Sequence, residues 1–170
     1  DENAQSILIT TDAAFASSVC DAVDERLKTL ERALIARASW ENFGAVITVP
    51  SLDVAAQLSD RIAPEHLELC VPNPDALAQK IRHAGAIFLG AWTPEAIGDY
   101  IGGPNHVLPT ARSARFSSGL SVIDFMKRTT LASMSAEALR EIGPAAETLA
   151  RSESLEAHGL SVTARLKKLN

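Results

Sequence analysis

Six acid and imidazole side chains stand in short stretches that contain little apolar surface. They are Glu65, His66, Asp99, His106, Glu153 and His158. Carboxylates and imidazoles act as general acids and bases, and both are ligands for Zn²⁺. The chain has no H-x-x-x-H or C-x-x-C spacing and no G-x-G-x-x-G fingerprint, so a metal or cofactor site must draw its residues from remote segments. Spacing alone therefore favours acid–base or zinc chemistry only weakly.

Several of these residues also have a purely structural interpretation. Glu65-His66 is compatible with a turn in which both side chains bind the backbone. Glu153 and His158 would lie roughly 140° apart around a helix, which is compatible with a solvated face. Asp99 is different, because a carboxylate in the last turn of a helix opposes the negative end of the helix dipole. It needs a positive partner, which is a metal ion, an arginine or a substrate ammonium group.

The composition is typical of a soluble globular domain. The 170 residues are 46% hydrophobic, and the formal net charge is −5. Basic residues are scattered, which argues against a nucleic-acid partner, and no apolar run approaches the roughly 20 residues of a membrane helix. Cys20 and Cys70 stand in apolar contexts, which predicts buried free thiols in a reducing cytoplasm. We expect a cytoplasmic protein that binds a small molecule, with neither nucleic acid nor membrane as a partner.

Short apolar runs alternate with amphipathic stretches in the first part of the chain. Short apolar runs predict strands at 6–10, 44–49, 65–71 and 86–90, and the first of them is rich in β-branched residues. Apolar residues spaced three or four apart predict a helix at 13–38, and residues typical of helix starts and ends predict helices at 52–62, 75–83 and 94–101. Helices between strands imply parallel pairing. We therefore predict an α/β fold in which a parallel sheet has flanking helices.

The last part of the chain has a different pattern. Residues 110–120 read as a polar loop, 129–134 as a strand, and 135–142 as a helix that Gly143-Pro144 ends. A helical pattern then runs from 145 to 169, but its few apolar positions require another surface to pack on. We predict two domains, an α/β domain over 1–112 and a small, mainly helical tail over 113–170.

Five stretches resemble the histidinol dehydrogenase family: RIAPEHLEL at 61–69, GAIFLG at 85–90, GDYIGGPNHVLPT at 98–110, ARFSSGLSVIDFMKR at 114–128 and ESLEAH at 153–158. The resemblance implies an enzyme that oxidises L-histidinol to L-histidine through L-histidinal. Each of its two steps passes a hydride to NAD, at the end of histidine biosynthesis. The resemblance also implies bound zinc and a partial Rossmann-like sheet in the α/β domain.

The resemblance assigns the catalytic and metal-binding roles. It implies that Glu65 activates the water that attacks the aldehyde and that His66 is the general base. Imidazole suits that task because its base form is present near neutral pH. Asp99 and His158 match zinc ligands, and zinc would explain the carboxylate at a negative helix end.

The substrate contacts and the oligomeric state are implied in the same way. His106, Tyr100 and Glu153 match residues that contact L-histidinol. In the family, Glu153 and His158 come from the neighbouring subunit of a homodimer, so that the active site is shared between subunits. The tail over 113–170 is therefore expected to be the dimerisation element.

The chain departs from the family mainly in length, because family members are more than twice as long. A Gln-Ala-Glu-His motif with two further zinc ligands should precede Asp1, as should the domain with most of the NAD contacts. No NAD-binding residue is assigned for that reason, and we expect the chain alone to be inactive. Ser154 replaces a family glycine. Serine in a helix costs less than glycine, so we expect this departure to be minor.

Two other classes of function stay open. The chain is also compatible with a stand-alone dimerisation or binding module that keeps the fold without catalysis. A metallohydrolase has no residue spacing in its favour.

Overall fold

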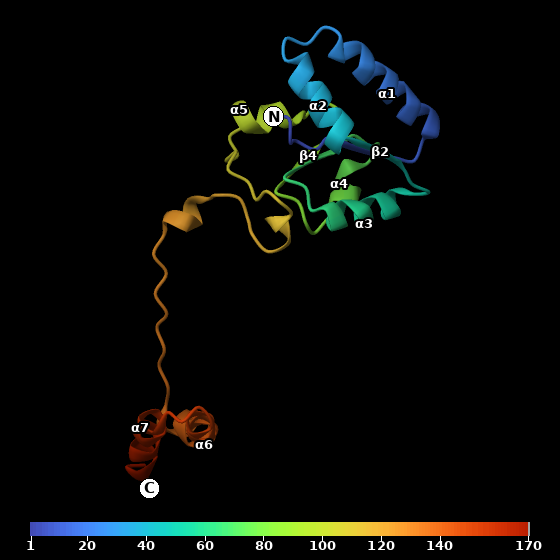
Figure 1. Cartoon of the computed structure of the whole chain (residues 1–170). Coiled ribbons are helices and arrows are strands. Elements are labelled where there is room, and N and C mark those ends of the chain that lie inside the picture. The colour runs from blue at the N-terminus through green and yellow to red at the C-terminus, as the bar shows by residue number, and fades with distance from the viewer. Residues whose placement is uncertain (170) are drawn as a thin grey trace. The chain divides into compact units, whose positions relative to one another are not determined.

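The computed structural model describes residues 1–169, which form two compact units, Asp1–Phe125 and the chain from Met126 onward (Figure 1). The first unit contains the strands and five of the helices, and the second contains two helices. The mixed α/β class that the sequence predicts is confirmed. The division into an α/β domain over 1–112 and a dimerisation tail over 113–170 stays a prediction.

Four short strands of the first unit form two parallel pairs. β1 (Ile7–Thr10) pairs with β2 (Ala45–Thr48), and β3 (His66–Leu69) pairs with β4 (Ala86–Leu89). Each parallel pair needs a crossover connection, which α1 and α2 supply for the first pair and α4 supplies for the second. Figure 1 shows α1 and α2 on one side of the strands and α3 on the other. All four predicted strands are confirmed, with shorter bounds.

The single helix predicted over 13–38 is wrong, because the structure has two helices there. α1 (Ala13–Leu27) begins at Asp12, whose side chain accepts from two backbone N–H groups, and α2 runs over Ala33–Phe43. After α1 the Thr29 hydroxyl and backbone N–H both bind the Arg26 carbonyl. Such local bonds compete with helix continuation. Apolar spacing alone did not reveal the turn.

α3 (Leu52–Ile62) begins at Ser51 and ends at Ala63, which is left-handed with φ 51° before Pro64. α4 (Pro74–Ala78) is shorter than the predicted helix over 75–83. Beyond α4, the backbone N–H groups of Arg82 and His83 bind the Asp60 carboxylate instead of helix carbonyls. The small core of this region has the buried residues Ala56, Leu69 and Leu77, with Leu67, Val71, Ala78 and Ile81 packed against them.

The chain beyond β4 holds one short helix and two 3₁₀ turns. α5 (Glu95–Tyr100) is followed by η1 (Ser113–Arg115) and η2 (Val122–Phe125). The guanidinium groups of Arg112 and Arg115 donate to the Arg61 carbonyl at 2.7 and 2.6 Å. These bonds fasten the loop before η1 to the end of α3.

The second unit is a pair of packed helices, α6 (Ala136–Ser152) and α7 (Glu156–Lys167). The predicted end at Gly143-Pro144 is wrong, because α6 continues through it. Gly143 is buried, and a Cβ atom there would lie 3.2 Å from Val162 and Leu166 of α7. This helix–helix packing outweighs the local cost of proline, about 3 kcal/mol. The predicted strand over 129–134 is also wrong, since residues 127–135 have no regular structure.

The helix pair turns at Ser154, which is left-handed with φ 60°. Its N–H donates to the Arg151 carbonyl at 3.0 Å, and the Leu155 N–H donates to the Ala150 carbonyl at 2.8 Å. This is the Schellman pattern, in which glycine is the favoured left-handed residue. Ser154 is therefore outside the helix, and the argument that serine replaces a helical glycine cheaply is wrong.

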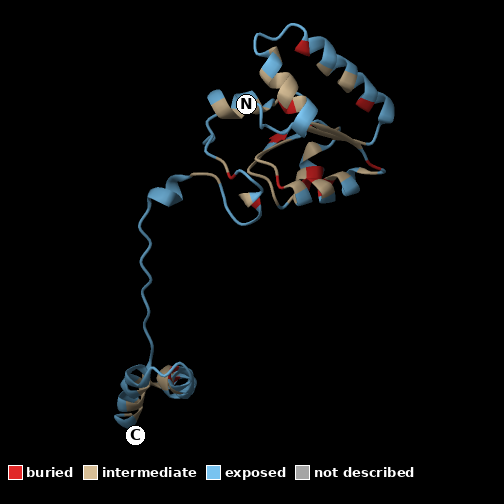
Figure 2. Ribbon diagram, in the orientation of Figure 1, coloured by how far each residue is buried: buried red, intermediate tan, exposed pale blue. Residues whose placement is uncertain are grey.

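Few residues of either unit are buried (Figure 2). No side chain of the described residues is less than 2% exposed. Cys20 is half-buried and Cys70 is exposed, so the expected burial of Cys70 is wrong, although both thiols are free as predicted. No described helix is long and apolar enough to cross a membrane.

Candidate functional site

An imidazole and two carboxylates meet where β3 approaches α5. His66 is the first residue of β3, and Glu95 and Asp99 stand one turn apart on α5. One ligand atom from each of the three lies within 4.8 Å of the others. His66 Nε2 lies 3.2 Å from Asp99 Oδ1 and 3.8 Å from Glu95 Oε1. We call these three residues the acid–imidazole cluster.

β3 also holds the start of α5. Glu68 follows His66 by two positions, and alternate residues of a strand share a face. The Glu68 carboxylate accepts from the Glu95 backbone N–H at 2.7 Å. The first residue of α5 is thus tied to β3 through Glu68, and its last turn is tied to β3 through His66 and Asp99.

Phe88 and Gly98 set how closely α5 approaches the strands. The Phe88 ring is buried on β4, and its centroid lies 6.0 Å from that of the His66 ring. A Cβ atom at Gly98 would overlap the Phe88 ring. Glycine at this position of α5 therefore lets Glu95 and Asp99 reach His66.

The two carboxylates of the cluster have opposite pKa shifts. A hydrogen bond with Asp99 raises the pKa of Glu95, and partial burial adds to this. Partial burial raises the pKa of Asp99 as well, but hydrogen bonds with Glu95 and His66 lower it by more, so that the net shift is downward. The pair therefore holds a proton on Glu95 more readily than on Asp99. Environments that separate two neighbouring acids in this way are common at functional sites.

Three other predicted site residues, Glu65, Tyr100 and His106, also belong to the first unit. Glu65 directly precedes β3 and is half-buried, and its carbonyl accepts from the Ala86 N–H at 2.9 Å. His106 is exposed, and its charge lowers the pKa of Asp99, so it lies within electrostatic range. Tyr100 is 87% exposed. The structure thus brings His66 and Asp99 together.

Glu153 and His158 belong to the second unit. Glu153 follows the last residue of α6, His158 is in the first turn of α7, and both are exposed. Their predicted roles, substrate contact for Glu153 and zinc ligand for His158, stay predictions.

Glu95 is the residue that the sequence argument missed. An acid in the first turn of a helix is favoured by the helix dipole, so its presence there needs no further function. The overlooked signal is its spacing, because Glu95 precedes Asp99 by four residues and residues four apart share one face of a helix.

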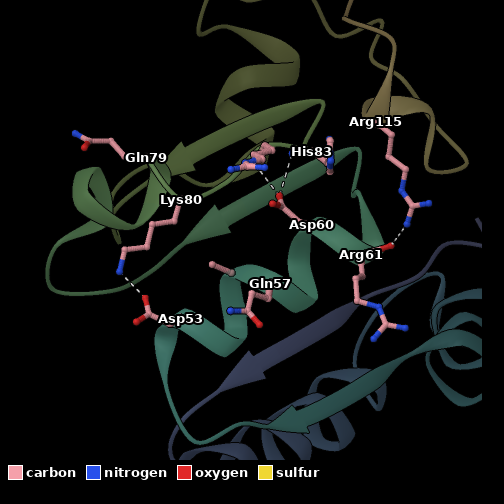
Figure 3. Close-up of a pocket in the computed structure, with 10 residues that line it drawn as sticks. Asp53, Gln57, Asp60, Arg61, Gln79, Lys80, His83 and Arg115 are labelled. Carbon is pink, nitrogen blue, oxygen red and sulfur yellow. Dashed lines mark hydrogen bonds and ion pairs between the residues drawn. The ribbon is translucent and has the colours of Figure 1, made fainter.

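A second polar region lies between α3 and the segment after α4 (Figure 3). This hollow has a volume of about 890 Å³, and it contains none of the predicted site residues. Its two acids are already matched. Asp53 forms an ion pair with Lys80, and the Asp60 carboxylate accepts from the backbone N–H groups of Arg82 and His83 at 2.8 and 3.0 Å. We call this region the polar hollow and take the acid–imidazole cluster as the candidate site.

Comparisons with known proteins agree with the resemblance. The family model described as histidinol dehydrogenase matches residues 1–166. The chain is 75% identical over 170 residues to a histidinol dehydrogenase of Ruegeria pomeroyi and 72% identical over 170 residues to one of Cereibacter sphaeroides. It covers 39% of the length of each, and each match covers 100% of this chain.

A solved structure gives the same result. The fold is similar to the crystal structure of histidinol dehydrogenase from Elizabethkingia anophelis, with a TM-score of 0.82 and 37% sequence identity. That match covers 98% of this chain and 38% of the other. The chain therefore belongs to the histidinol dehydrogenase family, of whose members it spans a little over a third.

Proposed function

We propose that this chain forms the C-terminal part of an enzyme that oxidises L-histidinol to L-histidine in two NAD-dependent steps. The observation that carries the proposal is the contact of His66 with Asp99, 3.2 Å between Nε2 and Oδ1. These residues come from segments 33 positions apart, and their types match the general base and the zinc ligand of the family. Glu65, the proposed water-activating acid, directly precedes His66.

The chemistry needs two proton removals and one hydration. His66 takes the hydroxyl proton of L-histidinol as a hydride leaves the same carbon for NAD, which gives L-histidinal. Glu65 activates the water that adds to the aldehyde carbon. His66 then takes a proton from one hydroxyl of the hydrate as the second hydride leaves, and the carboxylic acid formed in this step ionises in water to the carboxylate of L-histidine. One imidazole can serve both steps because it returns its proton to solvent between them.

The carboxylate of Asp99 and the imidazole of His158 are donor types that fit zinc. In the acid–imidazole cluster, two carboxylates lie beside one imidazole, and within residues 1–169 no lysine or arginine forms an ion pair with either. Nitrogen and carboxylate-oxygen donors are ordinary zinc ligands. We propose that Asp99 holds the ion together with His158. Bound zinc would orient the substrate through its imidazole and amino groups.

The remaining contacts follow from the same proposal. His106, Tyr100 and Glu153 bind the substrate, and Glu153 and His158 are supplied by the partner subunit of a homodimer. The two parallel strand pairs would be parts of one Rossmann-like sheet, and residues 113–170 would form the dimerisation tail. We also propose that the protein is cytoplasmic.

A chimera tests the function. The matching segment of the Ruegeria pomeroyi enzyme, 75% identical over 170 residues, is replaced by this chain. The purified chimera is assayed with zinc, NAD and L-histidinol by the absorbance of reduced NAD. We expect turnover, and we expect His66→Asn to lower kcat by about 10²- to 10⁴-fold, the usual contribution of a general base.

The matched control is His83→Asn, because His83 lines the polar hollow and not the cluster. It should leave kcat unchanged. A folded, zinc-loaded chimera that shows no turnover, or one in which His66→Asn is as active as the parent, would contradict the proposal.

A dimerisation module without catalysis is the second candidate. It is favoured by large apolar side chains that are exposed from η1 onward, among them Phe116 at 85%, Phe125 at 80% and Leu131 at 93%. Such side chains are typical of an interaction surface. This candidate predicts a chimera that assembles as a dimer but does not oxidise L-histidinol.

A further inference from the structure

We propose that Glu68 is a positioning residue that caps α5 from the neighbouring strand and so sets where Asp99 lies relative to His66. The proposal rests on the function proposed above, in which Asp99 is a zinc ligand. The Glu68 carboxylate accepts a hydrogen bond from the Glu95 backbone N–H at 2.7 Å. Glu95 is the first residue of α5, and Asp99 lies about one helical turn further on. A side chain of β3 therefore holds the helix that carries the proposed ligand.

Within residues 1–169, no side chain next to α5 in the sequence caps its start. Pro94 precedes the helix and makes no side-chain hydrogen bond to its first turn. The Thr93 hydroxyl donates instead to the Leu89 carbonyl at 2.9 Å. The N–H groups at a helix start need an acceptor, and a carboxylate is favoured there by the helix dipole. Glu68 supplies that acceptor from 27 positions away in the sequence.

The position of α5 depends on individual contacts, because none of its six residues is buried. So short a helix is only marginally stable without tertiary contacts. Near the middle of α5, Gly98 lies against the Phe88 ring. Glu68 and His66 stand two positions apart on one face of β3, and they hold the start and the last turn of the helix. Without the Glu68 bond, α5 could pivot on the Phe88 ring and displace the Asp99 carboxylate.

Displacement of Asp99 would weaken zinc binding without changing the donor set. Zinc ligands must converge within about 2 Å of the ion, so the position of each ligand matters as much as its type. Groups that orient a metal ligand from outside typically contribute about 10- to 100-fold in metal affinity or activity. Glu68 acts on the backbone of α5 and not on the Asp99 side chain, so we expect an effect at the lower end of that range.

The test uses the chimera with Glu68→Ala, Glu68→Gln and the surface control Glu25→Ala, whose parent residue pairs with Lys28 on α1. The zinc affinity of each metal-free protein is measured by competition with a chelator, and its thermal unfolding is recorded. We expect Glu68→Ala to lower zinc affinity roughly 10-fold, and its turnover of L-histidinol to need a correspondingly higher zinc concentration. Glu68→Gln keeps an oxygen that can accept from the Glu95 N–H, so it should retain the parental zinc affinity. The control should match the parent, and all the metal-free proteins should unfold at similar temperatures, because α5 is not buried.

Three results would overturn the proposal. Parental zinc affinity in Glu68→Ala would show that the bond to α5 does not position Asp99. Equal loss of zinc affinity in Glu68→Ala and Glu68→Gln would show that the charge of Glu68 matters, and not its bond to the helix. A clearly lower unfolding temperature of metal-free Glu68→Ala would make its role structural. In each case an active parent chimera whose kcat depends on His66 leaves the proposed function intact, whereas a parent chimera without zinc or turnover would overturn that function as well.

Discussion

The acid–imidazole cluster and the polar hollow lie in the same compact unit and use the same residue types, yet they balance charge differently. In the polar hollow, Asp53 faces Lys80, and Asp60 faces two backbone N–H groups. In the cluster, Glu95 and Asp99 face each other beside an imidazole. Both acids of the hollow thus have partners within the chain, whereas the cluster keeps two acids together that have no basic partner on a lysine or arginine in residues 1–169.

The difference shows that volume is a poor guide to function here. The hollow offers about 890 Å³, but its acids already have their partners. The cluster is small, but holding two acids together costs free energy, which a bound cation would offset. Acids with perturbed pKa values are candidates for a functional site. Three substitutions, taken from the largest effect to the smallest, test whether the two regions differ in this way.

Removing the charge of Asp99 should have the largest effect. In the chimera, Asp99→Asn keeps the shape and one oxygen but loses the negative charge next to His66. We expect kcat to fall by on the order of 100-fold or more, beyond the cost of most outer-shell changes, and we expect zinc content to fall with it. Steady-state assays and elemental analysis check this.

The matched change in the hollow is Asp53→Asn, whose parent residue is exposed and paired with Lys80. It should keep full activity and zinc content. Equal activity of both variants would show that the cluster is no more functional than the hollow.

Gly98→Ala should disturb the cluster without altering its chemistry. The added methyl group would overlap the Phe88 ring, so α5 must shift away from β4. Small displacements at a reacting centre are costly, and we expect kcat/KM to fall on the order of 10-fold. Overpacking costs about 1–3 kcal/mol, which the better helix propensity of alanine offsets by about 1 kcal/mol. Kinetics and thermal unfolding are compared.

Gly159→Ala in α7 is the control, because a Cβ atom there meets its neighbours at 3.7 and 3.9 Å, which is ordinary contact. It should gain stability and keep activity. A Gly98→Ala chimera as active as this control would mean that α5 does not need its close approach.

Asp60→Ala should affect stability and leave activity unchanged. It removes the acceptor of two backbone N–H groups, so we expect the free energy of unfolding to fall by about 1–3 kcal/mol. Denaturant unfolding and the L-histidinol assay, run on the same protein, measure the two effects separately. Lys80→Met, which breaks a surface ion pair, should cost at most about 1 kcal/mol. A clear loss of kcat in Asp60→Ala would assign the hollow a part in catalysis.

The sequence predicted elements wherever a local signal is strong. Short apolar runs between turn residues identified all four strands, and the helix predicted over 52–62 has the same bounds as α3. It failed where tertiary contacts decide. α6 passes through Gly143-Pro144 because Gly143 packs on α7, and residues 129–134 have β propensity but no partner strand. Local propensity predicts neither the continuation of α6 nor the absence of a strand at 129–134, since both depend on contacts with residues elsewhere in the chain.

The candidate site was predicted in the same uneven way. His66 and Asp99 were found from their motifs, and the structure places them 3.2 Å apart. Glu95 was missed, because one helical acid near a helix start has a sufficient local explanation. Its proximity to His66 depends on how α5 lies against β3, which spacing within α5 does not reveal.

The left-handed corner at Ser154 has one further consequence. Glu153 stands immediately before it and His158 lies in the first turn of α7 just after it, so the backbone bonds at the corner set how far apart these two backbone positions lie. In the proposed homodimer, the partner subunit would deliver a substrate contact and a metal ligand in a single event. Dilution that separates the subunits would then abolish both at once, and activity and zinc would disappear over the same range of protein concentration.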